Sequence, residues 1–292
     1  FSLSTLTAAV LVNFGFVHKH HSYPNTSKVA GQSAIESFGA RSDQNTAEQL
    51  EDLQSSTGLL MSSCHTTRTI HTLSHQLKGE TINHVVGPLS IPISAETLAV
   101  ALIGVNDNVH PETIIEALSI LKSKGVQNYA NSVAFCGLNK DGLIPEHLNP
   151  EKYYKSSKAK LSVAIDEVAP PPYLTLASFL VNGKNQGTYA IEPEDFMDKS
   201  LLREIDYQQL LIPNTFDDIM TANKSALQGS DRAKSLYLAM TGALALFTKD
   251  YAHLPGALDK SKSKVNREYL RQAYSRVLKT ILSGKGYQKL LE

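Results

Sequence analysis

Short apolar runs of strand length alternate with segments of helical periodicity along the chain, and this alternation limits the possible folds more than any other feature. The strand-like runs lie at 59–61, 98–103 and 132–136. Between the last two, an apolar repeat of helical period begins at Pro111 and ends at Gly125. Strands separated by helices pair in parallel, because the helix returns the chain to the same edge of the sheet. The sequence therefore predicts an α/β fold with a central mixed, mostly parallel sheet flanked by helices.

One connection predicts an antiparallel pair at an edge of this sheet. The apolar segments 174–181 and 188–191 flank Asn182-Gly183, a dipeptide that favours a two-residue β-turn. Beyond this hairpin the apolar spacing is helical, and it predicts helices at about 215–227, 231–249 and 264–282.

The composition is that of one large α/β domain, with 292 residues and 28 basic against 28 acidic side chains. A net charge of zero argues against a generally basic nucleic-acid-binding surface and leaves room only for a local patch. Cys64 and Cys136 lie far apart and indicate no disulfide framework, so we expect a reducing, cytoplasmic environment. No apolar run approaches the ~18 residues of a membrane-spanning helix, so no membrane partner is expected.

The first 39 residues give the strongest indication of function. Ser4 and Thr5 open an apolar helix, which leads into a His/Lys cluster at 18–21 and then to Gly31 at the start of a second helix. Hydroxyls and unpaired N–H groups at a helix start, followed by a lysine, are typical of phosphate-binding sites. A plain helix cap and a solvated basic loop are the alternative interpretations of the same residues. The chain starts without Met within what reads as a helix cap, so we expect a segment upstream of it.

An acidic pair, Asp166 and Glu167, follows the strand-like run 161–165. Carboxylates at the end of a strand can hold Mg²⁺ that a diphosphate substrate shares; two exposed loop acids are the alternative. Cys64 and His65 suggest a nucleophile and a base, but no third group orients them. The chain contains neither the glycine-rich P-loop motif nor the dinucleotide-binding motif, so those two functions have no support.

Taken in order, these pieces resemble anthranilate phosphoribosyltransferase and its paralogues, the nucleoside-phosphorylase-like group of glycosyltransferase family 3. The most specific match is the segment 81–92, which contains Thr81-Ile82 and Gly87-Pro88-Leu89 and is similar to the family's T-I-F-N-L-L-G-P-L-T-N-P. Weaker matches follow the family's order over nearly the whole chain, at Phe1–Thr5, Lys19-His20, Ala34–Gly39, Leu102–Val105 with Asp107, Asp166-Glu167, Tyr189 with Pro193–Phe196, Ala222-Asn223 and Ser283–Lys285.

The resemblance implies transfer of the phosphoribosyl group of phosphoribosyl diphosphate, with Mg²⁺ as cofactor, by a homodimer. It implies that Ser4 helps to hold one magnesium ion, and that Asp166 and Glu167 hold the other. It also implies that residues 1–292 form the family's α/β domain, with a surface insertion at about 137–162, and that a smaller, all-helical domain lies largely upstream of Phe1. The implied substrate-binding residues are Ser2, Thr5, Lys19, His20, His21, Ser22, Thr26, Ser27, Gly31 and His75.

Two departures from the family pattern concern the acceptor. The family's K-H-G-N-R reads K-H-H-S-Y at 19–23, so its glycine, asparagine and arginine are all changed. The arginine that grips the carboxylate of anthranilate falls near Ser74-His75, where a neutral serine cannot replace a charge-assisted bond. We therefore expect an acceptor other than anthranilate.

Two functions of different classes remain open. The first is a magnesium-dependent enzyme of the phosphoribosyltransferase type, favoured by the retained Ser4, Thr5, Lys19 and acidic pair. The second is a non-catalytic protein of the same fold that binds nucleic acid through a basic groove, favoured by the altered loop 19–23 and by a lysine-rich stretch at 152–160. In that stretch tyrosines alternate with lysines, which suits phosphate contacts and base stacking as well as a solvated loop: Lys152, Tyr153, Tyr154, Lys155, Lys158 and Lys160.

Overall fold

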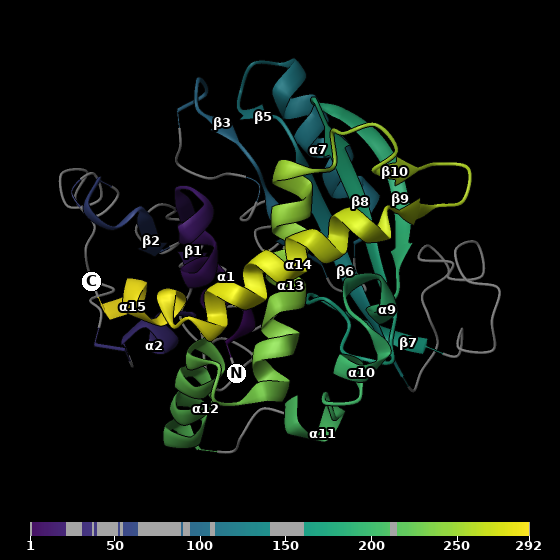
Figure 1. Cartoon of the computed structure of the whole chain (residues 1–292). Helices are drawn as coiled ribbons and strands as arrows, with labels where there is room; N and C mark the ends of the chain where they lie inside the picture. Colours follow the sequence, from purple (N-terminus) through teal and green to yellow (C-terminus); the bar gives the residue numbers. More distant parts are fainter. Residues whose placement is uncertain are drawn as a thin grey trace. The chain divides into compact units, whose positions relative to one another are not determined.

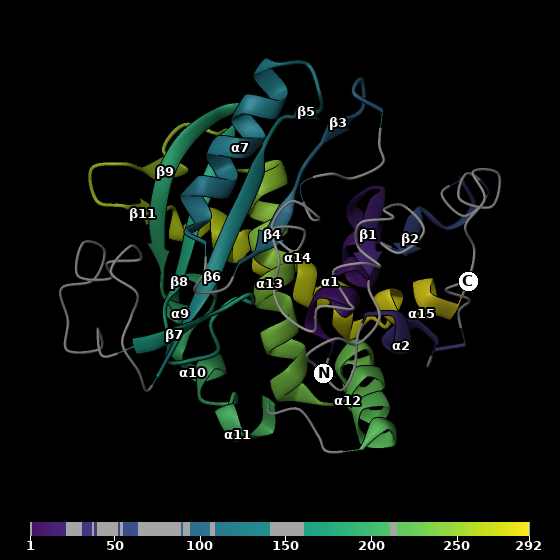
Figure 2. The ribbon, with the colours of Figure 1, turned by 180° about the vertical axis from the view of Figure 1, so that it is seen from behind.

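The structure of the protein is a computed structural model, and it describes residues 2–21, 31–36, 38–39, 52, 55–63, 89, 94–105, 109–140, 161–210 and 215–291 (Figures 1 and 2). The chain divides into two compact units. The first unit comprises Phe1–Pro92, Gln208–Gly242 and Val277–Glu292, and the second comprises Ile93–Tyr207 and Ala243–Arg276.

The second unit contains a five-stranded mixed sheet in the order β4-β6-β8-β9, with β7 paired to β6. β4 and β6 are parallel, whereas β6 is antiparallel to both β7 and β8, and β8 is antiparallel to β9. Two short pairs accompany this sheet, the parallel pair β3/β5 and the antiparallel pair β10/β11. The strands are β3 (Leu98–Ala99), β4 (Leu102–Gly104), β5 (Asn128–Tyr129), β6 (Ser132–Lys140), β7 (Leu161–Ile165), β8 (Thr175–Val181), β9 (Lys184–Ile191), β10 (Leu258–Asp259) and β11 (Lys264–Val265).

The predicted α/β class is confirmed, with a mixed sheet and flanking helices, and the connections explain which strands are parallel. Helix α7 (Pro111–Ser123) returns the chain from β4 to β6, which makes that pair parallel. A two-residue turn joins β8 to β9 instead, so these strands run antiparallel. Among the five described strands of this sheet, antiparallel neighbours therefore outnumber parallel ones, in contrast to the mostly parallel sheet that the sequence predicted.

Helix α7 forms where the sequence predicted it and lies across one face of the sheet (Figure 2). Its N-cap is His110, whose Nδ1 accepts the N–H of Glu112 at 3.0 Å, and the helix ends just before Gly125, at φ +67°. Ile115 and Leu118 are fully buried and pack toward β6, β8 and β9. The helix stops at a glycine because this backbone conformation carries a steric penalty for other residues.

The predicted hairpin at Asn182-Gly183 is confirmed. Both turn residues have positive φ, 51° and 75°, as a type I′ turn requires. Every residue of β8 is buried, which places this strand at the centre of the second unit's core. Phe179 lies there between Tyr189 and Phe247, with ring centroids 5.6 Å and 5.8 Å away and both pairs edge-to-face.

Two of the three predicted C-terminal helices are found within one residue of their expected bounds, as α12 (Phe216–Gln228) and α13 (Arg232–Asp250). Thr215 is the N-cap of α12, since its hydroxyl accepts the N–H of Asp218 at 3.2 Å. The third prediction, 264–282, began too early: residues 264–265 form β11, and α14 starts only at Arg267 (Arg267–Leu282). Short helices complete this region, namely α9 (Pro193–Phe196), α10 (Lys199–Leu202), α11 (Tyr207–Leu210) and α15 (Lys285–Leu291).

The first unit is mainly helical. Its helix α1 (Leu3–Leu11) packs against α2 (Gly31–Glu36), α12 and α15, and a 3₁₀ turn, η1 (Val12–Phe14), extends it. The unit also holds a parallel pair of strands, β1 (Val17–His21) and β2 (Leu59–Ser63). The strand expected at 59–61 is thus confirmed, whereas the His/Lys cluster at 18–21 is part of a strand and not of a solvated loop.

The ends of the expected surface insertion at 137–162 belong to the sheet. Residues 137–140 continue β6, and β7 begins at Leu161, so only residues between these strands can form an insertion, and these lie outside the described residues. The match at 81–92, apart from Leu89, also lies outside them. None of the helices that the structure describes combines the length and apolarity needed to cross a membrane.

Candidate functional site

The acidic pair lies directly after β7, in the second unit. Asp166 is exposed and Glu167 is partly exposed. Their backbone lies against Gly104, the last residue of β4, and Gly137 in β6, two glycines that we call the glycine shelf. A Cβ on Gly104 would come closer than 3.0 Å to the Asp166 carbonyl group, and one on Gly137 would lie 2.6 Å from the Glu167 carbonyl oxygen. Any residue other than glycine is therefore excluded at these two positions beneath the acidic pair.

The acidic pair thus lies beside the carboxyl end of β4, the place where open α/β sheets bind their ligands. Its chemistry fits Mg²⁺, which usually takes one or two carboxylates and completes its shell with phosphate oxygens and water. Within the described ranges no three His, Cys, Asp or Glu side chains gather as a metal site. A magnesium ion at Asp166 and Glu167 would therefore take its remaining oxygens from water or from a phosphorylated ligand.

The N-terminus of α1, in the first unit, is the second candidate feature. The helix starts at Leu3 with Ser2 as N-cap, slightly earlier than the sequence suggested, so Ser4 lies within the first turn and is exposed. Thr5 is buried, at 1% exposure. The N–H groups of the first turn have no acceptor within the helix, and they carry the positive end of its dipole. This helix start can therefore bind an anionic oxygen.

Asn223, on α12, fixes this helix start. Its Oδ1 accepts the N–H of Ser2 at 2.9 Å, while the side chain of Ser2 forms no capping bond. The residue is fully buried, and its Nδ2 has no hydrogen-bond partner among the described residues. A buried amide donor at this position suits an anionic oxygen, because an unpaired donor costs about 1–3 kcal/mol. In the sequence Asn223 appeared only as a landmark of the resemblance.

Replacing Asn223 by alanine should lower the free energy of unfolding by about 2 kcal/mol, because the Ser2 N–H loses its acceptor and a buried cavity opens. Urea unfolding followed by circular dichroism measures this. The matched control is Asn13→Ala, since exposed Asn13 only donates to the Val10 carbonyl at the other end of α1. Equal losses in the two variants would contradict a special role for Asn223.

Most of the remaining candidates of the first unit that the structure describes lie on β1. His18 and Lys19 are both partly buried, and burial lowers the pKa of His18 to about 4, with the charge of Lys19 adding to the effect. His20 and His21 complete the strand opposite Ser62 and Ser63 of β2. Gly31 is the first residue of α2. Ser22, Thr26, Ser27 and His75 lie outside the described residues, as do Cys64, His65 and Lys152–Lys160.

The candidate residues thus fall into two groups. Ser2, Ser4, Thr5 and the β1 residues belong to the first unit, and the acidic pair belongs to the second. That Ser4 and the acidic pair serve the same bound ligand stays a prediction.

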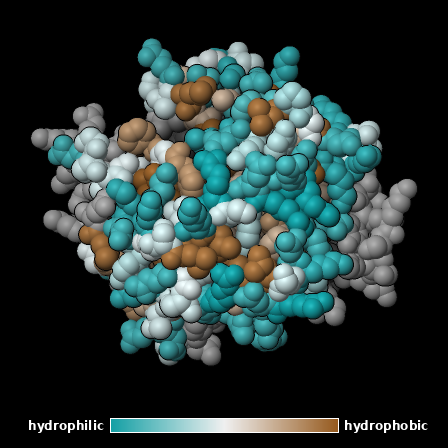
Figure 3. All heavy atoms as spheres, viewed as in Figure 1, coloured by the Kyte–Doolittle hydropathy of each residue, from teal (hydrophilic) through white to brown (hydrophobic). Residues whose placement is uncertain are grey.

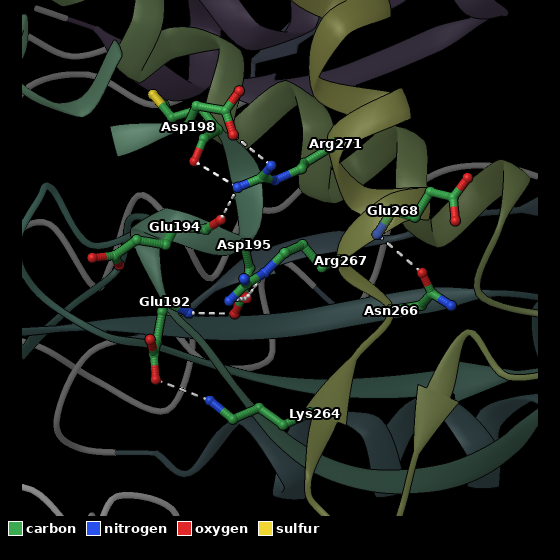
Figure 4. Close-up of polar contacts among 10 residues, drawn as sticks. Glu192, Glu194, Asp195, Asp198, Lys264, Asn266, Arg267, Glu268 and Arg271 are labelled. Atoms are coloured by element: carbon green, nitrogen blue, oxygen red, sulfur yellow. Dashed lines mark hydrogen bonds and ion pairs between the residues drawn. The ribbon is translucent and has the colours of Figure 1, made fainter. Parts of the chain in front are cut away.

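A polar cluster in the second unit explains another motif of the resemblance, Pro193–Phe196 (Figure 4). Asp195 is almost fully buried; its Oδ2 accepts the N–H of Glu192 at 2.9 Å and its Oδ1 accepts Nε of Arg267 at 3.0 Å. Arg271 donates to the carbonyl of Glu194 at 2.9 Å and to Asp198 at 2.6 Å. These acids are engaged in holding α9 against α14, so the motif is structural.

The described surface shows no dominant apolar area in the view of Figure 3, where small apolar groups are interspersed with hydrophilic side chains. Such scattered exposure is ordinary for folded proteins and does not by itself mark a binding site. Among the described residues, the exposed large apolar ones are Phe16, Leu98, Val100, Ile120, Val126, Phe216, Leu282 and Leu291.

Comparison with known proteins shows the fold. No family model and no curated protein matches the sequence. Among solved structures, the chain is similar to anthranilate phosphoribosyltransferase from Thermus thermophilus, with a TM-score of 0.60, 17% identity and coverage of 99% of this chain and 71% of that one. It is also similar to the anthranilate phosphoribosyltransferase from Saccharomyces cerevisiae, solved in complex with PRPP and Mg, with a TM-score of 0.61, 15% identity and coverage of 99% and 68%.

Proposed function

We propose that the protein is a phosphoribosyltransferase that uses phosphoribosyl diphosphate and Mg²⁺ and transfers the phosphoribosyl group to an acceptor other than anthranilate. The observation that carries the proposal is the acidic pair on its glycine shelf, beside the carboxyl end of β4. The shared fold supports it, because one of the similar structures holds PRPP and Mg.

In this proposal the main role of the protein is to place positive charge around the diphosphate of the substrate. Asp166 and Glu167 hold the magnesium, which when bound supplies positive charge to the leaving diphosphate. The first turn of α1, with the Ser4 hydroxyl and its free N–H groups, binds a phosphate oxygen, and Lys19 adds a point charge. Bond cleavage at the anomeric carbon releases diphosphate and the acceptor nucleophile takes its place, so the protein needs no covalent intermediate.

The altered acceptor residues support a substrate without the carboxylate of anthranilate. Position 21 is a histidine where the family has glycine, and Ser74-His75 replaces the region of the carboxylate-binding arginine. We therefore propose an uncharged or differently charged aromatic or amine nucleophile. A homodimer in the cytoplasm belongs to the same proposal and rests on the resemblance and on the cysteine pattern.

Calorimetric titration with phosphoribosyl diphosphate, with and without Mg²⁺, tests the proposal. We expect micromolar binding, about −8 kcal/mol, only with Mg²⁺. Asp166→Asn and Glu167→Gln should each weaken it at least about tenfold, a loss of about 1.4 kcal/mol per factor of ten. The matched control is Glu96→Gln, an exposed acid of the same unit.

Absence of heat at millimolar phosphoribosyl diphosphate would reject the proposal. Nucleic-acid binding across a salt series would then be the next measurement, since its affinity falls steeply with salt. That second function rests on the altered loop 19–23 and on the lysine-rich sequence at 152–160.

A further inference from the structure

The glycine shelf is required by sterics and not by backbone conformation. Neither Gly104 nor Gly137 has φ in the left-handed region, so an L-residue could adopt either backbone conformation. What excludes a Cβ is the chain above them. Because the two glycines carry no Cβ, the backbone of residues 166–169, which we call the acidic segment, approaches the sheet more closely than any side chain would permit.

The atoms that a methyl group would meet are backbone atoms of the acidic segment. At Gly104 they are the carbonyl and Cα of Asp166, and at Gly137 they are the Glu167 carbonyl oxygen and the Ala169 N, at 2.6 Å and 2.8 Å. A flexible side chain could rotate away, but a backbone must move as a whole. To relieve this contact, the backbone would have to move from 2.6 Å to the ordinary contact distance of 3.4 Å. This movement is larger than the tolerance of about 0.2 Å in metal–ligand distances.

The segment is also fixed just after the acidic pair, by Thr175 of β8, the strand partner of Gly137. The Ala169 N–H donates to the buried Thr175 Oγ1 of β8 at 2.9 Å, and Val168 and Ala169 are fully buried. A methyl group on Gly104, which would meet only Asp166, would therefore displace the exposed end of the segment, where the two carboxylates are.

We propose that Gly104, Gly137 and Thr175 are positioning residues that set the two carboxylates for a divalent cation, the glycines from beneath and the Thr175 hydroxyl from the side. This inference rests on the proposed magnesium site at Asp166 and Glu167. It makes that site's affinity depend on three residues that do not coordinate the ion.

The test uses Mn²⁺ as the probe, with free Mn²⁺ measured by electron paramagnetic resonance, on the whole chain. Gly104→Ala should weaken Mn²⁺ binding at least about tenfold, close to the loss in Asp166→Asn. The matched control is Gly256→Ala, in the same unit, where φ is +72° and nothing lies within 4 Å of the added Cβ. That control carries a conformational cost without touching the acidic segment.

A second pair of variants avoids the steric change, in case Gly104→Ala fails to fold. Thr175→Val keeps the side-chain shape and removes the hydroxyl that accepts the Ala169 N–H. Its control is Thr188→Val, a buried threonine of β9 whose hydroxyl contacts Ser178 and Glu112 instead. We expect a three- to tenfold loss of Mn²⁺ affinity in Thr175→Val alone, and faster hydrogen exchange in peptides that span 166–174.

The outcomes separate the two proposals. Wild-type protein that binds no Mn²⁺ at millimolar concentration would overturn the magnesium site and the positioning role with it. In a second outcome, the wild type binds Mn²⁺ and Asp166→Asn abolishes this binding, but Gly104→Ala and Thr175→Val bind as well as their controls. This result would overturn the positioning role and leave the proposed function standing. Loss of affinity together with faster exchange, in these two variants and not in the controls, is the supporting result.

Discussion

Replacing Phe179 by alanine should lower the free energy of unfolding by about 3–5 kcal/mol, the usual cost of deleting a fully buried aromatic ring. Phe179 stands in β8 between Tyr189 and Phe247, so its loss opens a cavity and removes two edge-to-face contacts. The sheet cannot collapse into the space easily, because every residue of β8 is buried and the strand is paired on both sides. A loss of this size is a large part of the roughly 5–15 kcal/mol that typically stabilises a domain.

Urea unfolding followed by circular dichroism measures this effect. Phe179→Leu keeps most of the buried volume and should lose clearly less than Phe179→Ala. Phe16→Ala is the matched exposed control, since 76% of Phe16 is accessible, and it should change the stability by less than about 0.5 kcal/mol. A Phe179→Ala protein as stable as Phe16→Ala would contradict the central place of β8 in the core.

The first unit should lose up to about 3 kcal/mol of stability as the pH falls from 6.5 to 4, because His18 is neutral in the folded chain. Its pKa is lowered from 6.5 to about 4, first by burial and second by Lys19. Between these two values the unfolded state binds the proton and the folded state does not. Stability therefore stands at its full value above pH 6.5 and declines toward pH 4.

Comparison of unfolding at pH 7 and at about pH 4.5 in wild type and His18→Gln isolates this contribution from that of other groups. The variant should lose less stability on acidification than wild type. Lys19→Gln should fall between them, because it removes only the smaller of the two causes. Equal acid losses in wild type and His18→Gln would contradict the prediction.

The parts of the fold that sequence could predict are those with local chemical signals. The helix at 111–123 has a proline at its start and a glycine after its end, and both act on the backbone directly. The turn at Asn182-Gly183 needs two residues with positive φ, and few dipeptides provide them. Each of these predictions depends on residues only a few positions apart.

What the sequence could not predict depends on partners far away in the chain. The cluster at 18–21 is polar, yet it forms a strand because β2, a distant segment of the chain, supplies its hydrogen bonds (Val17 pairs with Leu59). Residues 264–265 fall within the predicted helix 264–282, but they pair with β10 instead. The sheet's antiparallel character follows from how β6 meets β8, which no local pattern encodes.

The candidate site shows the same division. The acidic pair was visible as two carboxylates after a strand, but Gly104 and Gly137 gained meaning only when the fold brought them beneath it. Asn223 likewise contacts Ser2 across 221 positions of sequence. Residues that bind by charge can be read from a pattern, whereas residues that position others become apparent only in three dimensions.

Neither compact unit is a continuous piece of polypeptide. The first is assembled from three stretches and the second from two, and three of the four divisions fall inside helices: between Tyr207 and Gln208 of α11, Gly242 and Ala243 of α13, and Arg276 and Val277 of α14. No single truncation can isolate one unit, because the segments of the two units alternate along the chain. Expression of fragments should therefore give unstable products, and folding must wait until the C-terminal helices have been synthesised, since they complete both units.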